Sequence, residues 1–155
     1  MADDATRPRA PHPRGGHEGG LYRLLVETDD PVAEVSDFAA FREAGMQVDL
    51  CCGSDRRGAA CPLASGNECT LANDADAVLV ELDANGVAPH RHLHALALFH
   101  PTVPLVVSAP RDVAPAGGAL PDRAIVLPMP ASVNEQVRVV RRAVIEGRRR
   151  RLDQG

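Results

Sequence analysis

The stretch Asp76–Asp83, DAVLVELD, decides the fold class of this chain of 155 residues. It holds four apolar residues in a row, two of them β-branched valines, between acidic residues. A short continuous apolar run of this kind is typical of a strand that is buried on both faces, in the middle of a parallel sheet. We therefore expect a central strand here, with helices on both faces of its sheet.

Apolar runs and amphipathic stretches alternate along the rest of the chain. Further strands are predicted at Tyr22–Thr28, Met46–Cys51, Val103–Ser108 and Ala124–Leu127, and helices at 31–44, 89–99 and from Ser132 to the basic end of the chain. A capping box, Ser132 to Glu135, marks the start of the last helix, and Val133, Val137, Val140 and Val144 line one of its faces. Strands that alternate with helices predict a single α/β domain with a five-stranded parallel sheet.

The composition limits the classes of function. A net charge of −4 at pH 7 argues against nucleic acid as a partner. No apolar run is long enough to span a membrane and the N-terminus has no apolar signal core, so the sequence predicts a cytoplasmic protein without a membrane partner. Residues 1–20 are predicted to be a disordered leader, 21–147 the folded domain, and 148–155 a basic C-terminal tail in which Arg148–Arg151 form a solvated helix end.

Polar residues mark the carboxyl ends of the predicted strands, where α/β sheets bind ligands. Asp29-Asp30 follows the first strand, Glu81 lies five residues after Asp76, Ser108-Ala109 ends the fourth strand, and Met129-Pro130 follows the fifth. This pattern resembles the receiver (CheY-like) domains of response regulators, which accept a phosphoryl group from a histidine kinase, and it covers residues 21–147. The resemblance implies a flavodoxin-like sheet of order 2-1-3-4-5 and a regulatory module with a protein partner in signalling, not an enzyme.

Two residues depart from the receiver pattern. Glu81 occupies the position of the acceptor Asp, and Met129 replaces the Lys that would stabilise the phosphoryl group. The chain contains no Lys at all. The resemblance therefore implies a pseudo-receiver with a degenerate pocket that does not accept phosphate, made of Asp29, Asp30, Glu81, Ser108 and Met129. Its acids are either ordinary solvated strand-end residues or a weak Mg²⁺ site, since hard oxygen ligands converge there.

Every cysteine lies in a loop between the second and third predicted strands, at Cys51, Cys52, Cys61 and Cys69. Glycines and Pro62 break any long helix in this loop, where a receiver has an ordinary one. In a reducing compartment such thiols bind metal more often than they form disulfides. Four thiolates suit zinc or an iron–sulfur cluster, and the adjacent Cys51 and Cys52 favour the larger cluster. The alternatives are a redox pair, Cys61 with Cys69, and cysteines that only pack.

The same loop resembles that of small receiver-like proteins of actinobacteria. The shared pattern is Cys-x-Gly, Cys-Pro-Leu and Gly-x-x-Cys, in which Cys51, Cys61 and Cys69 are the matching positions. The leading hypothesis is therefore a non-phosphorylated regulatory module whose cysteine loop binds a metal or senses redox state. The alternative is a phosphorylation-independent interaction domain with inert cysteines, and a homodimer is open in both cases. The histidines of 89–99 are interpreted as a solvated helix start.

Overall fold

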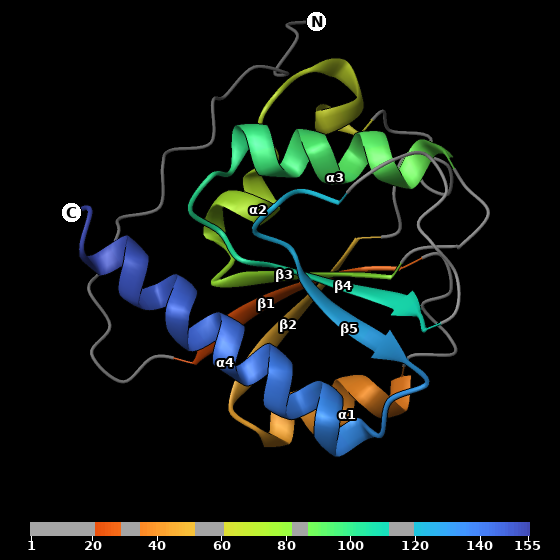
Figure 1. The fold of residues 1–155 in the computed structure, drawn as a ribbon. Helices are drawn as coiled ribbons and strands as arrows, with labels where there is room; N and C mark the ends of the chain where they lie inside the picture. Colours follow the sequence, from red (N-terminus) through yellow and green to blue (C-terminus); the bar gives the residue numbers. More distant parts are fainter. Residues whose placement is uncertain (1–20, 29–34, 52–60, 82–86, 112–119) are drawn as a thin grey trace, which may run out of the picture.

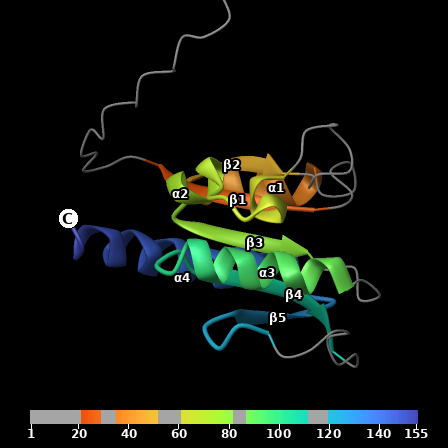
Figure 2. The ribbon, with the colours of Figure 1, turned by 90° about the horizontal axis from the view of Figure 1, so that it is seen from above.

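The computed structural model describes residues 21–28, 35–51, 61–81, 87–111 and 120–155, with the side chains of 35–37 and 87–90 excepted. Five strands form one sheet: β1 (Tyr22–Glu27), β2 (Met46–Cys51), β3 (Ala77–Glu81), β4 (Leu105–Pro110) and β5 (Ile125–Met129). All neighbours pair in parallel, in the order β2-β1-β3-β4-β5 (Figure 2). The predicted flavodoxin-like sheet is confirmed, with the stretch DAVLVELD supplying its central strand.

Helices cover both faces of the sheet (Figure 1). They are α1 (Val35–Glu43), the 3-10 helix η1 (Pro62–Ser65), α2 (Thr70–Asp74), α3 (Val87–Phe99) and α4 (Val133–Leu152). Residues of α1 and α4, such as Phe41 and Val144, pack with Leu24 of β1 in one apolar cluster. Residues of α2 and α3, such as Ala72 and Leu93, form the second cluster on the opposite face. None of the described helices combines the length and the apolar character that crossing a membrane requires.

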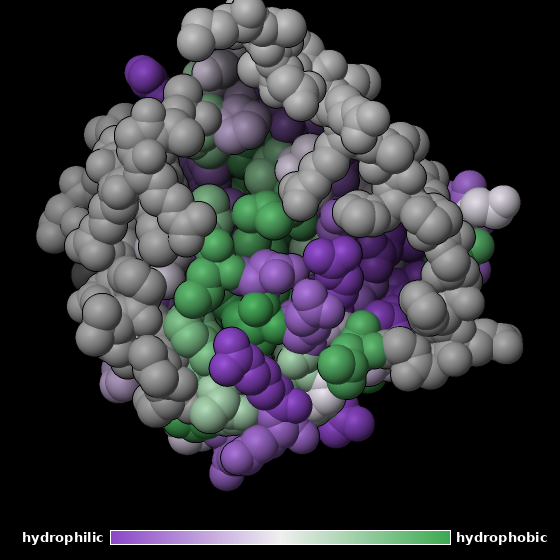
Figure 3. Space-filling model, turned by 180° about the vertical axis from the view of Figure 1, so that it is seen from behind, coloured by the Kyte–Doolittle hydropathy of each residue, from purple (hydrophilic) through white to green (hydrophobic). Residues whose placement is uncertain are grey.

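The strands β2 and β5 form the two edges of the sheet. Val48 and Leu50 of β2 are only half-buried. The view from behind, onto the side of β2, shows apolar residues in the middle of the face with hydrophilic residues beside and below them (Figure 3). Apolar and polar residues alternate along β2, and its apolar residues Met46, Val48 and Leu50 contribute to the core cluster beneath α1.

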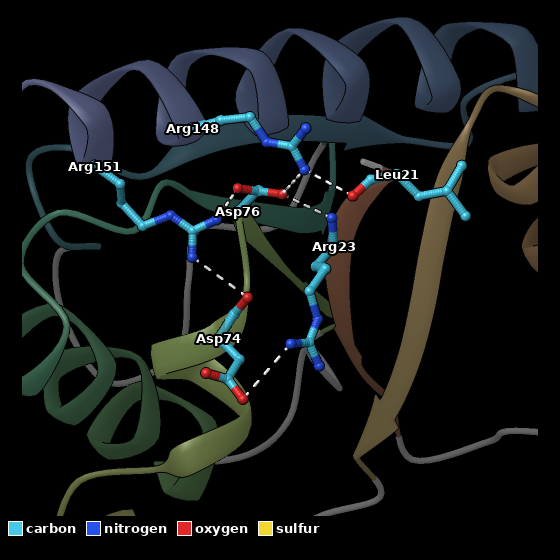
Figure 4. Close-up of polar contacts among 6 residues, drawn as sticks. All are labelled: Leu21, Arg23, Asp74, Asp76, Arg148 and Arg151. Atoms are coloured by element: carbon cyan, nitrogen blue, oxygen red, sulfur yellow. Dashed lines mark hydrogen bonds and ion pairs between the residues drawn. The ribbon is translucent and has the colours of Figure 1, made fainter. Parts of the chain in front are cut away.

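A buried carboxylate at the amino-terminal end of the sheet fixes α4 in place (Figure 4). The side chain of Asp76 is fully buried, and its Oδ2 accepts hydrogen bonds from the backbone N–H of Arg23 at 2.7 Å and from Nη2 of Arg148 at 3.0 Å. Arg151 donates to the other oxygen of Asp76. Arg148 also donates to the backbone oxygen of Leu21 at 2.7 Å, so one guanidinium joins α4 to the first residues of the domain.

The end of α4 contains Arg148–Arg151, as predicted, but these arginines are not all solvated. The helix continues to Leu152. Two of these arginines are tied to Asp76, and only Arg149 and Arg150 are exposed as the prediction of a solvated end requires. The reason is electrostatic, because a carboxylate without contact with water needs cationic partners.

Candidate functional site

The carboxyl ends of β3 and β4 place two of the predicted pocket residues side by side. Glu81 ends β3 and lies opposite Ser108 of β4 in the parallel register. Glu81 is half-buried, whereas Ser108 is 7% exposed and its hydroxyl has no hydrogen-bond partner among the described residues. Asp29 and Asp30 lie outside the described residues. The described part of this edge therefore holds one carboxylate and one buried hydroxyl that has no hydrogen-bond partner among the described residues.

Met129 contributes an apolar side chain at the same edge of the sheet. It is the last residue of β5, paired with Pro110, and not a residue that follows the strand as predicted. Its side chain is half-buried against the apolar cluster under α1 and α4. The Met129–Pro130 peptide bond is cis. A methionine here supplies neither the charge nor the hydrogen-bond donor of an amine.

One ion pair beneath this edge was missed by the sequence analysis. Glu27, the last residue of β1, is 7% exposed and contacts Nε2 of His92 on α3 at 2.5 Å. Burial on its own lowers the pKa of His92, but the hydrogen bond and the negative charge of Glu27 outweigh it, so the pKa is raised. His92 is thus not a solvated residue of the helix start. Its protonated form is favoured by the buried carboxylate of Glu27.

The sequence offered only a weak signal for this pair. Glu27 is an acid that directly follows the apolar run Leu24–Val26, still within the predicted strand Tyr22–Thr28. Its partner is 65 residues away, on a helix with several histidines, and nothing in the spacing selects His92. The other histidines of that helix differ, since His94 is exposed and the side chain of His90 lies outside the described residues.

Three of the four cysteines reach the same side of the sheet. Cys69 is buried in the apolar cluster beneath α3. Cys51 and Cys61 are half-buried and pack against this cluster. No disulfide joins any two of these three described cysteines. Cys52 lies outside the described residues. The loop therefore gathers these thiols around one apolar cluster, where they pack as small hydrophobic groups do.

A buried histidine holds the end of the cysteine loop. The backbone N–H of Cys69 donates to Nε2 of His100 at 3.2 Å, and Nδ1 of the same ring pairs with Oδ1 of Asn73 at 3.0 Å. Because Nε2 accepts, Nδ1 carries the proton and the ring is neutral. Burial lowers the pKa of His100 in spite of the nearby charges of Glu68 and Glu27. His100 thereby stabilises the short helix α2.

The predicted four-cysteine metal centre finds no support in the described residues. No group of three or more His, Cys, Asp or Glu side chains within the described ranges is arranged to hold a metal ion. The packing of Cys51, Cys61 and Cys69 against apolar neighbours explains this, since each thiol meets the core and not a shared centre.

No protein-family model and no curated protein sequence matches the chain. Several solved structures, in contrast, match the chain in three dimensions. A transiently phosphorylated switch of bacterial signal transduction is 19% identical, with a TM-score of 0.59 and coverage of 83% of this chain and 98% of that one. The chain has the receiver-domain fold. A response regulator receiver domain from Clostridium thermocellum is 13% identical, with the same TM-score of 0.59 and the same coverage of 83% and 98%.

A third similar structure bears on the pocket. It is the receiver domain of a sensor histidine kinase from Pseudomonas aeruginosa, with magnesium coordinated in its active-site cleft. It is 18% identical, with a TM-score of 0.53, and the match covers 81% of this chain and 98% of that one. At these identities the likeness shows the receiver fold, and the chemistry of the pocket has to be argued from the residues of this chain.

Proposed function

We propose that this protein is a regulatory module of signal transduction that has the receiver fold and works without phosphorylation. The observation that carries the proposal is the composition of the strand-end pocket. Glu81 lies beside the buried hydroxyl of Ser108, and the apolar Met129 ends β5. The pocket thus keeps the position of a receiver site and lacks the groups that phosphoryl transfer needs.

The two departures act on the same step. Phosphoryl transfer depends on cations that stabilise the charge spread over the transferred group, and an amine supplies one of them in receivers. Met129 supplies none, and a chain without lysine has no other amine side chain to replace it. Glu81 adds one methylene to the acceptor side chain and displaces its carboxylate from the position of an aspartate. Both changes raise the barrier to transfer.

A module of this kind regulates by binding a protein partner. The carboxyl group of Glu81 is part of the chain, so an acidic group stands at the end of β3 without the action of a kinase. We infer that the partner recognises one fixed conformation of the domain. The proposed location is the cytoplasm, where receiver-like modules would meet such partners.

Magnesium fits the same pocket as a weak ligand. Hard cations prefer carboxylate and hydroxyl oxygens, and Asp29, Asp30 and Glu81 are the residues that would hold the ion. The hydroxyl oxygen of Ser108, which has no hydrogen-bond partner within the described ranges, is one more acceptor at this edge. When bound, the ion would neutralise part of the negative charge of these acids. Calorimetric titration with MgCl₂ should show weak binding that the change Glu81→Gln reduces.

The proposal is tested by incubating the pure protein with acetyl phosphate and Mg²⁺ and recording its intact mass. The expected result is an unchanged mass. A stoichiometric gain of one phosphoryl group that disappears in Asp83→Asn, the alternative acceptor two residues after Glu81, would overturn the proposal.

A second candidate function concerns the cysteine loop. Cys51, Cys61 and Cys69 gather around one apolar cluster beside α3, and we infer from this grouping a role in sensing redox state. The metal or iron–sulfur version needs Cys52 and a rearranged loop. Anaerobic purification, elemental analysis and visible absorption separate these readings. Protein that contains iron and sulfide, or one zinc ion, would support a metal site. A disulfide that forms and is reduced reversibly would support redox sensing. Four thiols that always react with a thiol reagent, without metal, would support inert cysteines.

A further inference from the structure

One buried ion pair lies on the face of the sheet that the candidate pocket does not use. Glu27 continues the alternation of β1 from Leu25, so its side chain points toward α3, where it contacts Nε2 of His92 at 2.5 Å. By the same alternation Glu81 and Ser108 point to the opposite face, which α1 and α4 cover (Figure 1). The Glu27–His92 pair therefore links β1 to α3 independently of the pocket.

Glu27 determines how the protein changes the proton affinity of His92. Burial alone would lower the pKa of His92, but the hydrogen bond and the charge of Glu27 raise it above its ordinary value. The other titratable side chains of the elements around this face are Arg23 of β1, Asp49 and Cys51 of β2, Cys61, Glu68 and Cys69 of the cysteine loop, Asp74 of α2, Arg123 before β5, Arg91 and His94 of α3, and His100 just after α3. Among the described groups, Glu27 is the one that opposes the effect of burial on His92.

The strength of the link between β1 and α3 depends on the proton of His92. Glu27 is 7% exposed, and a buried carboxylate needs a positive or hydrogen-bonding partner. A protonated imidazole gives a charge-assisted hydrogen bond and an ion pair, whereas a neutral imidazole gives the hydrogen bond without the ion pair. The side chain of His92 is 24% exposed, so its proton can exchange with solvent. The link is therefore strongest at low pH and weakens as the pH rises through the raised pKa of His92.

α3 covers the apolar cluster that contains the cysteines. Leu93 of α3 and Leu63 of η1 are buried in the same cluster as Cys69. The helix η1 contacts α3, and Cys61, which immediately precedes η1, packs against the cluster. A separation of α3 from the sheet would therefore uncover these thiols.

We propose that proton binding to His92 controls how firmly α3 is held on the sheet, and thereby how accessible the thiols of Cys61 and Cys69 are. With His92 protonated, the pair with Glu27 holds α3 over the cluster and shields the thiols. With His92 neutral, α3 separates from β1 more often and the thiols become accessible. The inference deepens the second candidate function, redox sensing by the cysteine loop, and rests on it, since it names what regulates access to the sensing thiols.

The test measures hydrogen exchange of the full chain by NMR at pH 6 and pH 8, in buffer without divalent cations. Each amide is described by its protection relative to an unstructured peptide at the same pH, which removes the intrinsic effect of pH on exchange. The variant His92→Lys is the reference, because a lysine there is charged at both pH values. From pH 6 to pH 8 the protection of the α3 amides in the unaltered chain should fall about tenfold relative to that in His92→Lys. His100 titrates in both proteins, so the comparison removes its contribution.

Thiol labelling provides a second measurement. The labelling rate of Cys69, divided by its rate in the urea-unfolded chain at the same pH, should rise about tenfold from pH 6 to pH 8 relative to His92→Lys. Glu27→Gln should lower the protection of α3 about tenfold at pH 6 and have little effect at pH 8. Glu43→Gln is the matched control, because Glu43 is exposed at the end of α1 on the opposite face of the sheet. It should change neither measurement.

The same response to pH in the unaltered chain and in His92→Lys would overturn the inference, as would equal effects of Glu27→Gln and Glu43→Gln. Protection of α3 equal to that of the slowest amides of α4 would overturn it too, since α3 would then open only with the whole domain. A pH-controlled α3 in a protein that forms no reversible disulfide would overturn only the redox candidate. A reversible disulfide together with a pH-independent α3 would overturn only this inference.

Discussion

The carboxylate of Asp76 accepts a hydrogen bond from Nη2 of Arg148 at 3.0 Å, across 72 residues of sequence. Asp76 immediately precedes the central strand β3, and Arg148 lies in the last turns of α4. The same guanidinium stacks over the ring of Tyr22, 4.3 Å from its centroid. One arginine therefore holds together the central strand, the first strand and the last helix, at the end of the sheet opposite the candidate pocket.

The first prediction is that Asp76→Asn lowers the free energy of unfolding by about 2–3 kcal/mol, as measured by urea denaturation. Breaking a buried pair by removing one charge usually costs about 3–5 kcal/mol, and the cost is smaller here because both arginines retain some contact with water. Asp74→Asn is the control. Asp74 is 63% exposed beside Arg23, so its loss should change stability by less than about 0.5 kcal/mol. Equal effects of the two changes would show that Asp76 does not anchor α4.

The second prediction concerns Gly147, where α4 makes its closest approach to the sheet. A Cβ atom added there would lie 1.9 Å from the backbone oxygen of Asp76 and 2.8 Å from Cδ of Pro104. Replacing glycine by alanine inside a helix normally stabilises it by about 1 kcal/mol. Here Gly147→Ala should instead destabilise the protein by about 3 kcal/mol in thermal or urea unfolding, because strand and helix must separate.

Gly155 provides the comparison for that substitution. An added Cβ at Gly155 would meet only the backbone oxygen of Arg151, at 3.9 Å. Gly155→Ala should leave stability unchanged. A stabilising Gly147→Ala would mean that α4 does not contact Asp76 as closely as described.

The third prediction concerns the pH dependence given by His92 and Glu27. The pKa of His92 is raised above its ordinary value of 6.5, so the folded protein binds this proton more tightly than the unfolded chain does. The stabilisation is fully present below pH 6.5 and is lost as the pH rises through the raised pKa. Glu27→Gln should remove about 1–2 kcal/mol below pH 6.5 and flatten this part of the stability profile.

The measurement is urea unfolding at a series of pH values, together with the NMR titration of His92. A His92 that titrates below 6.5 would contradict the ion pair with Glu27.

The fourth prediction concerns the reactivity of the buried thiol. Cys69 is 7% exposed, and its backbone N–H is held by His100. Native-state labelling with a thiol reagent, followed by peptide mass mapping, should modify Cys61 well before Cys69. His100→Ala removes the acceptor of that N–H and the partner of Asn73, so it should accelerate the labelling of Cys69 by about tenfold through local opening of α2. His94→Ala should leave both rates unchanged, and equal labelling of Cys61 and Cys69 in the unaltered protein would contradict the burial of Cys69.

The architecture could be predicted from the sequence because it depends on local patterns. The apolar run 77–80 identifies the central strand, and Ser132 caps α4 by accepting the N–H of Glu135 at 3.2 Å, as its capping box predicts. Val140 and Val144 are buried as the spacing requires. Val133 is 39% exposed, because it is the first residue of α4 and lies beyond the part of the helix that packs on the sheet.

The polar contacts could not be predicted, because they join residues that are distant in sequence. Asp76 appears in the sequence only as the acid that opens the central strand, and Arg148 and Arg151 as members of a charge run. Their pairing requires the helix to cross the end of the sheet at Gly147. The surroundings of the cysteines could not be predicted for a related reason. Their spacing does not reveal that Cys51, Cys61 and Cys69 face an apolar cluster.

The most direct test of the phosphorylation-independent pocket compares the unaltered chain with the double variant Glu81→Asp/Met129→Lys. Both positions lie at the carboxyl edge of the sheet, and the variant restores the acceptor and the amine that the receiver pattern places there. Each protein is incubated with acetyl phosphate and Mg²⁺, and its intact mass is recorded. We predict no gain for the unaltered chain and a gain of one phosphoryl group for the double variant. A phosphoryl group on the unaltered chain would contradict the claim that Glu81 and Met129 have ended phosphoryl transfer in this protein.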